Sequence, residues 1–106
     1  MWTVETLNDT VDDELEALPA DQRAKFIWIA ELITAHGLEQ VREPYVKHLE
    51  QGLWEIRMKG RDGISRAIYV VAKPKRVVVV RVFRKKTQKT PRREINIALE
   101  RAKEVT

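Results

Sequence analysis

Apolar positions recur with two different periods along the chain. Residues 2–6 alternate between apolar and polar, as a short strand does, and up to residue 37 the apolar positions then follow the helical period of about 3.6 residues. This period predicts one helix over residues 9–18 and a second over residues 20–35. Pro19 ends the first helix and fits the first turn of the second, and Gly37 is a natural stop for the second.

The second half of the chain predicts three consecutive antiparallel strands. In the first of them, apolar Trp54, Ile56 and Met58 alternate with polar residues, so one face of this strand is apolar. The third contains four consecutive valines, residues 77–80, which is typical of a strand covered on both faces. The three predicted strands span residues 53–59, 64–72 and 76–83.

Two further segments complete the predicted architecture. Residues 38–52 show no sustained period and predict a connection with one helical turn, whereas residues 92–105 have the apolar spacing of a helix. An early strand, two helices, a meander and a terminal helix favour an α+β fold in one domain, residues 1–106. We expect the first strand to pair with a later one, which places both early helices on one face of the sheet.

Charge divides the chain near residue 52. Residues 1–52 carry a net charge of −7 and residues 53–106 a net charge of +11. Within the basic half, residues 84–93 contain six lysines or arginines and no acid. This asymmetry predicts that one part of the surface binds an anion, although a solvated basic loop is the alternative for such a stretch.

The composition excludes several classes of protein. The chain has no cysteine, so it has no disulfide, thiolate metal site or thiol nucleophile. Its two histidines, His36 and His48, do not predict a metal site. His48 could act as a base, but the sequence gives it no orienting partner. No apolar run reaches the roughly 18 residues of a membrane span, and the first residues do not resemble a signal peptide. We expect a cytoplasmic globular protein without a cofactor.

Cations on the predicted strands are the candidate functional residues. Arg57 alternates away from the apolar face of its strand, whereas Arg66 has the same parity as apolar Ile68. A cation among apolar neighbours is costly without a partner, so Arg66 lies either at an open strand end or on a partly polar concave face. Tyr69 and Phe83 are either core residues or platforms on which bases stack. Cations beside aromatic rings are typical of sites for phosphates and stacked bases of RNA.

The sequence resembles the RelE/ParE superfamily of bacterial toxins, and within it the phage-derived HigB-like branch. The resemblance is most specific in residues 53–57, 63–69 and 82–91, where the last segment reads Val-Phe-Arg-Lys-Lys-Thr-Gln-Lys-Thr-Pro. It implies a RelE-like fold, with a curved antiparallel sheet, two N-terminal helices on one face and a C-terminal helix. It also implies the toxin of a type II toxin–antitoxin system, which cleaves mRNA in the ribosomal A site without a metal.

The implied chemistry is attack of the RNA 2′-hydroxyl on the adjacent phosphate. Arg66 matches the arginine that holds the scissile phosphate. The tyrosine or histidine that follows the last strand in the best-known members is missing from residues 85–106, so the base is either a lysine among other cations or Glu55. The resemblance assigns catalytic roles to Arg57, Arg66, Lys85 and Lys86. The residues expected to bind RNA are Tyr69, Phe83, Arg84 and Lys89.

The implied partners are a cognate antitoxin and mRNA in the ribosomal A site. In this branch the antitoxin is commonly a small helix-turn-helix protein, and we expect no membrane or small-molecule cofactor. Two alternatives share the fold: a ParE-like topoisomerase poison, and a non-catalytic phage-derived binding protein. The candidate cations favour the nuclease, because a protein that binds a topoisomerase needs no phosphate clamp.

Overall fold

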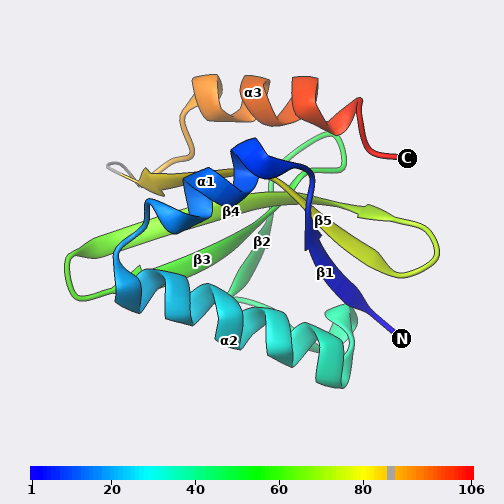
Figure 1. Cartoon of the computed structure of the whole chain (residues 1–106), viewed down its shortest axis with the longest axis horizontal. Coiled ribbons are helices and arrows are strands. Elements are labelled where there is room, and N and C mark those ends of the chain that lie inside the picture. Colours follow the sequence, from blue (N-terminus) through cyan, green and yellow to red (C-terminus); the bar gives the residue numbers. More distant parts are fainter. Residues whose placement is uncertain (86–87) are drawn as a thin grey trace.

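The computed structural model describes residues 1–85 and 88–106, and within them three α-helices pack against a five-stranded sheet (Figure 1). The strands are β1 (Thr3–Thr6), β2 (Val46–His48), β3 (Trp54–Gly60), β4 (Gly63–Ala72) and β5 (Arg76–Lys85). The helices are α1 (Asp9–Glu16), α2 (Ala20–His36) and α3 (Arg92–Ala102). No helix in this part of the chain is long and apolar enough to span a membrane.

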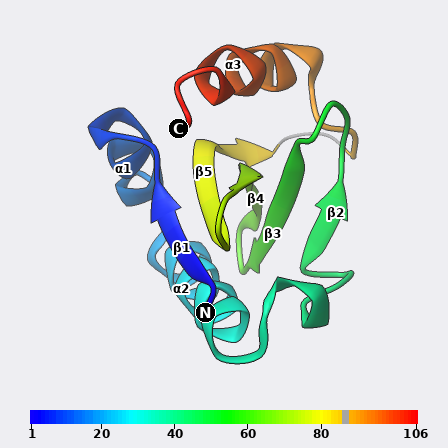
Figure 2. The same cartoon turned by 90° about the vertical axis from the view of Figure 1, so that its right-hand side faces the viewer.

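The spatial order of the strands is β1-β5-β4-β3-β2, and the sheet is curved and open (Figure 2). Strands β2 to β5 form an antiparallel meander, whereas β1 lies parallel to β5 with Val4 opposite Val77. The predicted α+β fold and the pairing of the first strand with a later one are therefore confirmed.

The segment between α2 and β3 differs from the prediction. The expected helical turn is present as a short 3-10 helix at Leu38–Gln40, but Val46–His48 also form β2, a fifth strand at the edge of the sheet. Three residues are too few to establish an alternating pattern, so the sequence predicted only a connection here. This strand matters because it brings its side chains beside β3.

Each face of the sheet has its own apolar core. Toward α1 and α2, the sheet packs Ile56, Met58 and Tyr69 against helical residues such as Ile29. The opposite face is covered by α3 (Figure 2). The four consecutive valines contribute to both cores, as predicted: Val77 and Val79 to the first, Val78 and Val80 to the second.

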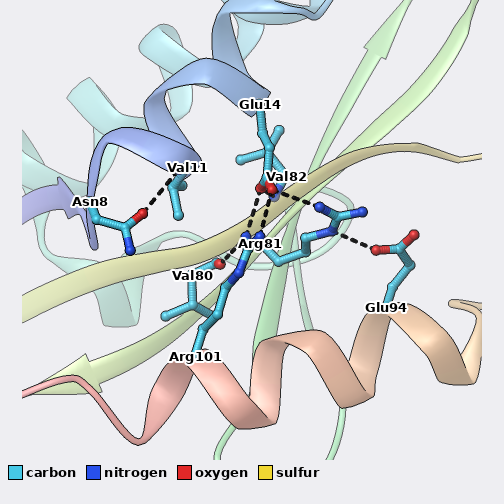
Figure 3. Close-up of polar contacts among 8 residues, drawn as sticks. All are labelled: Asn8, Val11, Glu14, Val80, Arg81, Val82, Glu94 and Arg101. Atoms are coloured by element: carbon cyan, nitrogen blue, oxygen red, sulfur yellow. Dashed lines mark hydrogen bonds and ion pairs between the residues drawn. The ribbon is translucent and has the colours of Figure 1, made fainter.

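A network of ion pairs joins α1, β5 and α3 (Figure 3). The Glu14 carboxylate accepts hydrogen bonds from Arg81 Nη1 at 2.6 Å, Arg101 Nη1 at 2.9 Å and the backbone N–H of Val82 at 3.0 Å. Arg81 Nε donates in turn to Glu94 at 2.6 Å. Because β1 pairs with β5 only as far as Val79, Glu14 satisfies a backbone donor on the uncovered edge of β5.

The network also perturbs two ionisation equilibria. Burial alone would raise the pKa of Glu14, but the hydrogen bonds from Arg101 and Val82 and the charges of Arg81 and Arg101 outweigh it, so the pKa is lower than usual. Burial alone would lower the pKa of Arg81, and the carboxylates of Glu94 and Glu14 outweigh it and raise the pKa. The network thus stabilises the folded chain while Glu14 is ionised.

We predict that Glu14→Gln lowers the free energy of unfolding by about 2 kcal/mol at pH 7, since it removes the charged acceptor of three hydrogen bonds. The folded-state pKa of Glu14 is below its usual value of 4.5, so this stabilisation is present above that value and is lost as the pH falls through the folded-state pKa. Urea unfolding between pH 7 and pH 3 should show the difference between variant and wild type shrinking with acidity.

Glu16→Gln is the matched control, because Glu16 lies on the same helix and is exposed. It should leave the free energy of unfolding within about 0.5 kcal/mol of the wild type. A Glu14→Gln effect equal to that of Glu16→Gln would show that the network does not contribute to stability.

Candidate functional site

A buried ion pair between Arg66 and Glu55 lies on the face of the sheet that α3 covers. Only 3% of Arg66 and none of Glu55 is exposed. Arg66 Nη1 donates to both carboxylate oxygens of Glu55 and to Thr90 Oγ1 at 3.2 Å, and Arg66 Nη2 donates to the Gln88 carbonyl at 3.4 Å. The Thr90 hydroxyl donates to Glu55 at 3.1 Å. The pair therefore joins β3, β4 and the segment that precedes α3.

The pair resolves the ambiguity that the parity of Arg66 left open. Arg66 shares its face with Ile68, and Ile68 lies directly opposite Glu55 in the register of β3 and β4. The face is therefore partly polar, as one of the two alternatives predicted. A buried guanidinium without a partner would carry a large desolvation cost, and Glu55 offsets it.

The ion pair lies in a pocket of about 230 Å³, which we call the Arg66 pocket. Lys47 of β2 lies opposite Glu55 in the register, so it approaches the pair from the edge of the sheet. The pocket is lined by Lys47, His48, Leu49, Glu50, Glu55, Arg66, Gln88, Lys89, Thr90 and Ile95. Over the described ranges, no three His, Asp or Glu side chains form a group that could hold a metal ion.

Three other predicted cations lie near Arg66. Lys85 Nζ donates to the Gln88 carbonyl, the same oxygen that accepts from Arg66. Arg57 lies directly opposite Arg66 in the register of β3 and β4, so both side chains leave the same face of the sheet. Lys89 lines the Arg66 pocket. The structure thus brings Arg57, Arg66, Lys85 and Lys89 to one face, and Lys86 lies outside the described residues.

The structure does not bring the other predicted residues to this pocket. Tyr69 is 1% exposed and belongs to the core on the opposite face, where burial raises the pKa of its hydroxyl. Phe83 is 8% exposed and packs in the core under α3. Arg84 is exposed and pairs with Ser65, whose side chain faces α2. Neither aromatic residue is available as a platform for a base.

Two residues of the pocket were missed by the sequence analysis. Lys47 could not be placed, because its strand was not predicted. Thr90 is buried, with 8% of its surface exposed, and its hydroxyl donates to Glu55. It directly precedes Pro91, the N-cap of α3. Its signal was the Thr-Pro pair, which marks the approach to a helix but does not indicate where the threonine side chain points.

Comparison with known proteins gives a family for this arrangement. The family described as Phage derived protein Gp49-like (DUF891) matches residues 13–103. Archaeal RelE, in the crystal structure of the RelE–RelB complex from Pyrococcus horikoshii, is 24% identical with a TM-score of 0.57. That match covers 78% of this chain and 93% of RelE, and at this identity it is a likeness of fold.

A search of curated proteins gives no significant match. The family match spans most of the chain and coincides with the elements that carry the pocket, from β2 to α3. The chain therefore belongs to the Gp49-like family of phage-derived proteins, a family of RelE/HigB-type toxins, and its fold is that of the RelE-like superfamily.

Proposed function

We propose that the chain is the toxin of a type II toxin–antitoxin system and cleaves mRNA in the ribosomal A site. The observation that carries the proposal is the convergence of Lys47, Arg66 and Lys89 around one buried carboxylate, Glu55, in the Arg66 pocket. Lys85 of β5 lies beside them, because it donates to the same Gln88 carbonyl as Arg66. Pooled guanidinium and ammonium groups can hold the extra negative charge of a pentacoordinate phosphorane. Attack of the 2′-hydroxyl on the neighbouring phosphate forms that species, and expulsion of the 5′-oxygen completes the cleavage.

The reaction needs a base, a charge stabiliser and a proton donor. Arg66 is the charge stabiliser, because its Nη1 already donates to both oxygens of a carboxylate, an anion that a guanidinium binds as it binds a phosphate. Glu55 is better suited than a lysine to be the base, since its carboxylate is an acceptor beside Arg66. Lys85, which donates to the same Gln88 carbonyl as Arg66, is the candidate proton donor for the leaving oxygen.

In this scheme the scissile phosphate must replace Glu55 on Arg66. Both are anions that the fork of a guanidinium can hold with two hydrogen bonds, so the exchange substitutes one ion pair for another. The displaced carboxylate is then free to accept the proton of the 2′-hydroxyl. Thr90 donates to Glu55 and keeps the carboxylate within the pocket during the exchange.

The proposal includes an antitoxin partner. The similar RelE was crystallised as a RelE–RelB complex. In this chain the second half carries a net charge of +11, and the Arg66 pocket lies within it apart from β2 and the residues that follow β2. An acidic segment of an antitoxin, in a small helix-turn-helix protein encoded beside the toxin, would cover these cations and prevent RNA from binding.

We predict that Arg66→Ala lowers cleavage of cellular mRNA about 100- to 1000-fold, because it removes a preorganised donor to the transition state. Primer extension after induction should show wild-type cleavage sites that are lost in the variant, and toe-printing should place them in the ribosomal A site. Lys75→Ala is the matched control, since Lys75 lies in the β4–β5 turn at the opposite end of these strands. If Arg66→Ala cleaves as the wild type does, the proposed mechanism is incorrect.

The same substitution should also destabilise the fold, because it leaves Glu55 as an unpaired buried charge. We predict a loss of about 3–5 kcal/mol in the free energy of unfolding for Arg66→Ala. The double variant Glu55→Gln with Arg66→Gln should lose less free energy of unfolding than the sum of the losses in the single variants Glu55→Gln and Arg66→Gln, yet remain inactive. Denaturant unfolding of the wild type, these two single variants and the double variant measures the coupling. Strictly additive losses would show that the pair has no energetic coupling.

Co-expression with the adjacent gene tests whether its product is the antitoxin that binds this chain. We expect growth arrest to be relieved and the two proteins to purify together, with the complex dissociating as the salt concentration rises, because charges dominate the predicted contact. Persistent arrest without a purified complex would contradict this prediction.

A further inference from the structure

A second pocket lies at the outer edge of β3, beyond the end of β2. It has a volume of about 320 Å³, and we call it the Arg57 pocket. The backbone N–H of Arg57 donates to the Tyr45 carbonyl at 2.8 Å, which holds the segment before β2 against this edge. The pocket is lined by Lys25, Pro44, Tyr45, Arg57, Lys59 and Ile64. Three of these residues are cations, and none is an acid.

The cations of the Arg57 pocket lack the anionic partners that neutralise the Arg66 pocket. Arg57 Nε is buried and has no hydrogen-bond partner among the described residues. A buried donor without an acceptor costs free energy, and an anion in the pocket would remove that cost. In the described chain, neither Lys25 nor Lys59 forms an ion pair with a carboxylate. The pocket is thus more electropositive than its neighbour.

Two aromatic rings accompany these cations. Lys25 Nζ lies 4.6 Å from the centre of the Trp28 ring and 5.5 Å from that of Tyr45. The two rings meet edge to face at 5.2 Å, and 42% of Trp28 is exposed. These contacts hold the ammonium group in place on the wall of the pocket. Cations beside aromatic rings suit a nucleotide, whose phosphate is anionic and whose base can stack.

The position of the pocket relates it to the Arg66 pocket. Arg57 and Arg66 are directly opposite in the sheet, where paired residues are about 5 Å apart. One RNA strand can therefore place neighbouring phosphates on the two arginines. We propose that the Arg57 pocket binds a nucleoside phosphate of single-stranded RNA, next to the nucleotide held at Arg66. Lys25, Arg57 and Lys59 hold the phosphate, and the Tyr45 ring contacts the base. This inference rests on the proposed function.

The two pockets then have different tasks. Binding at Arg66 requires displacement of Glu55, whereas the Arg57 pocket can take a phosphate without breaking an ion pair. The Arg57 pocket therefore contributes most of the initial affinity, and the Arg66 pocket performs the reaction on the neighbouring phosphate. Loss of the first should weaken RNA binding, while loss of the second should abolish cleavage with RNA still bound.

Binding of a short 2′-O-methyl single-stranded RNA, which cannot be cleaved, tests the inference by fluorescence anisotropy. We expect Lys25→Gln with Lys59→Gln to raise the Kd at least tenfold at low salt and to reduce the magnitude of the log–log salt slope by about 1.4, or about 0.7 per cation. Tyr45→Ala should raise the Kd about 5- to 150-fold through lost stacking. Circular dichroism verifies folding, and Lys75→Gln, which removes a cation from the distant turn, is the control.

Titration with uridine monophosphate or inorganic phosphate, followed by the NMR signal of the Trp28 indole, distinguishes a free nucleotide or phosphate from an RNA strand as the ligand of the Arg57 pocket. A shift with the nucleotide or with phosphate supports an anion in the Arg57 pocket, and tighter binding of the RNA supports the strand as its source. A Kd within twofold of wild type for Tyr45→Ala and for the lysine double variant overturns the inference.

The double variant Glu55→Gln with Arg66→Gln separates this inference from the proposed function. If it does not cleave but binds RNA more tightly than the Arg57-pocket variants do, both hold. If the wild type cleaves no RNA yet the Arg57-pocket variants lose RNA binding, the nuclease proposal fails and the binding site remains. If the wild type cleaves and the Arg57-pocket variants bind and cleave normally, only this inference fails.

Discussion

The buried ion pair between Glu55 and Arg66 is the constraint on which the functional face depends. Removing two charges from water costs free energy. In this pair the cost is offset by the mutual attraction of the charges and by hydrogen bonds with the Thr90 hydroxyl and the Gln88 carbonyl. The partners come from β3, β4 and the segment before α3, so the pair fixes the approach of that segment to the sheet. The fold thereby keeps Arg66, the arginine proposed to bind the phosphate, in position, with the Glu55 carboxylate accepting from its Nη1.

Charge elsewhere in the molecule serves mainly to join the two halves of the chain. The sequence shows an acidic first half and a basic second half, which suggested an external anion as the partner of the basic half. Part of that asymmetry is satisfied internally, because acids of the first half pair with arginines of the second. These pairs are Glu5–Arg76, Glu14–Arg81, Glu14–Arg101 and Glu50–Arg92. Among the described cations without a carboxylate partner are Arg57 and Lys59, and the pocket that they line has no acid.

Sequence periodicity predicted the helices, four of the five strands and the fold class, since these depend on local spacing. It also contained the information that Tyr69 faces away from Arg66, because residues an odd number of positions apart on one strand point to opposite faces. The pocket itself depends on residues distant in sequence. Lys47 reaches it through a strand of only three residues, and Thr90 through the path of a connection, neither of which leaves a periodic signal.

The placement of Glu55 has a consequence for how such a site distinguishes its substrate. A single weak anion cannot compete with a carboxylate that is already desolvated and held by two donors. In the proposed mechanism a strand of RNA can, because binding at Arg57 would raise the effective concentration of its next phosphate at Arg66, the residue directly opposite in the sheet. In that mechanism, exchange at the ion pair would release Glu55 to act as the base for the 2′-hydroxyl. The carboxylate that pairs with Arg66 in the folded chain would therefore also make the proposed reaction depend on a polymeric substrate.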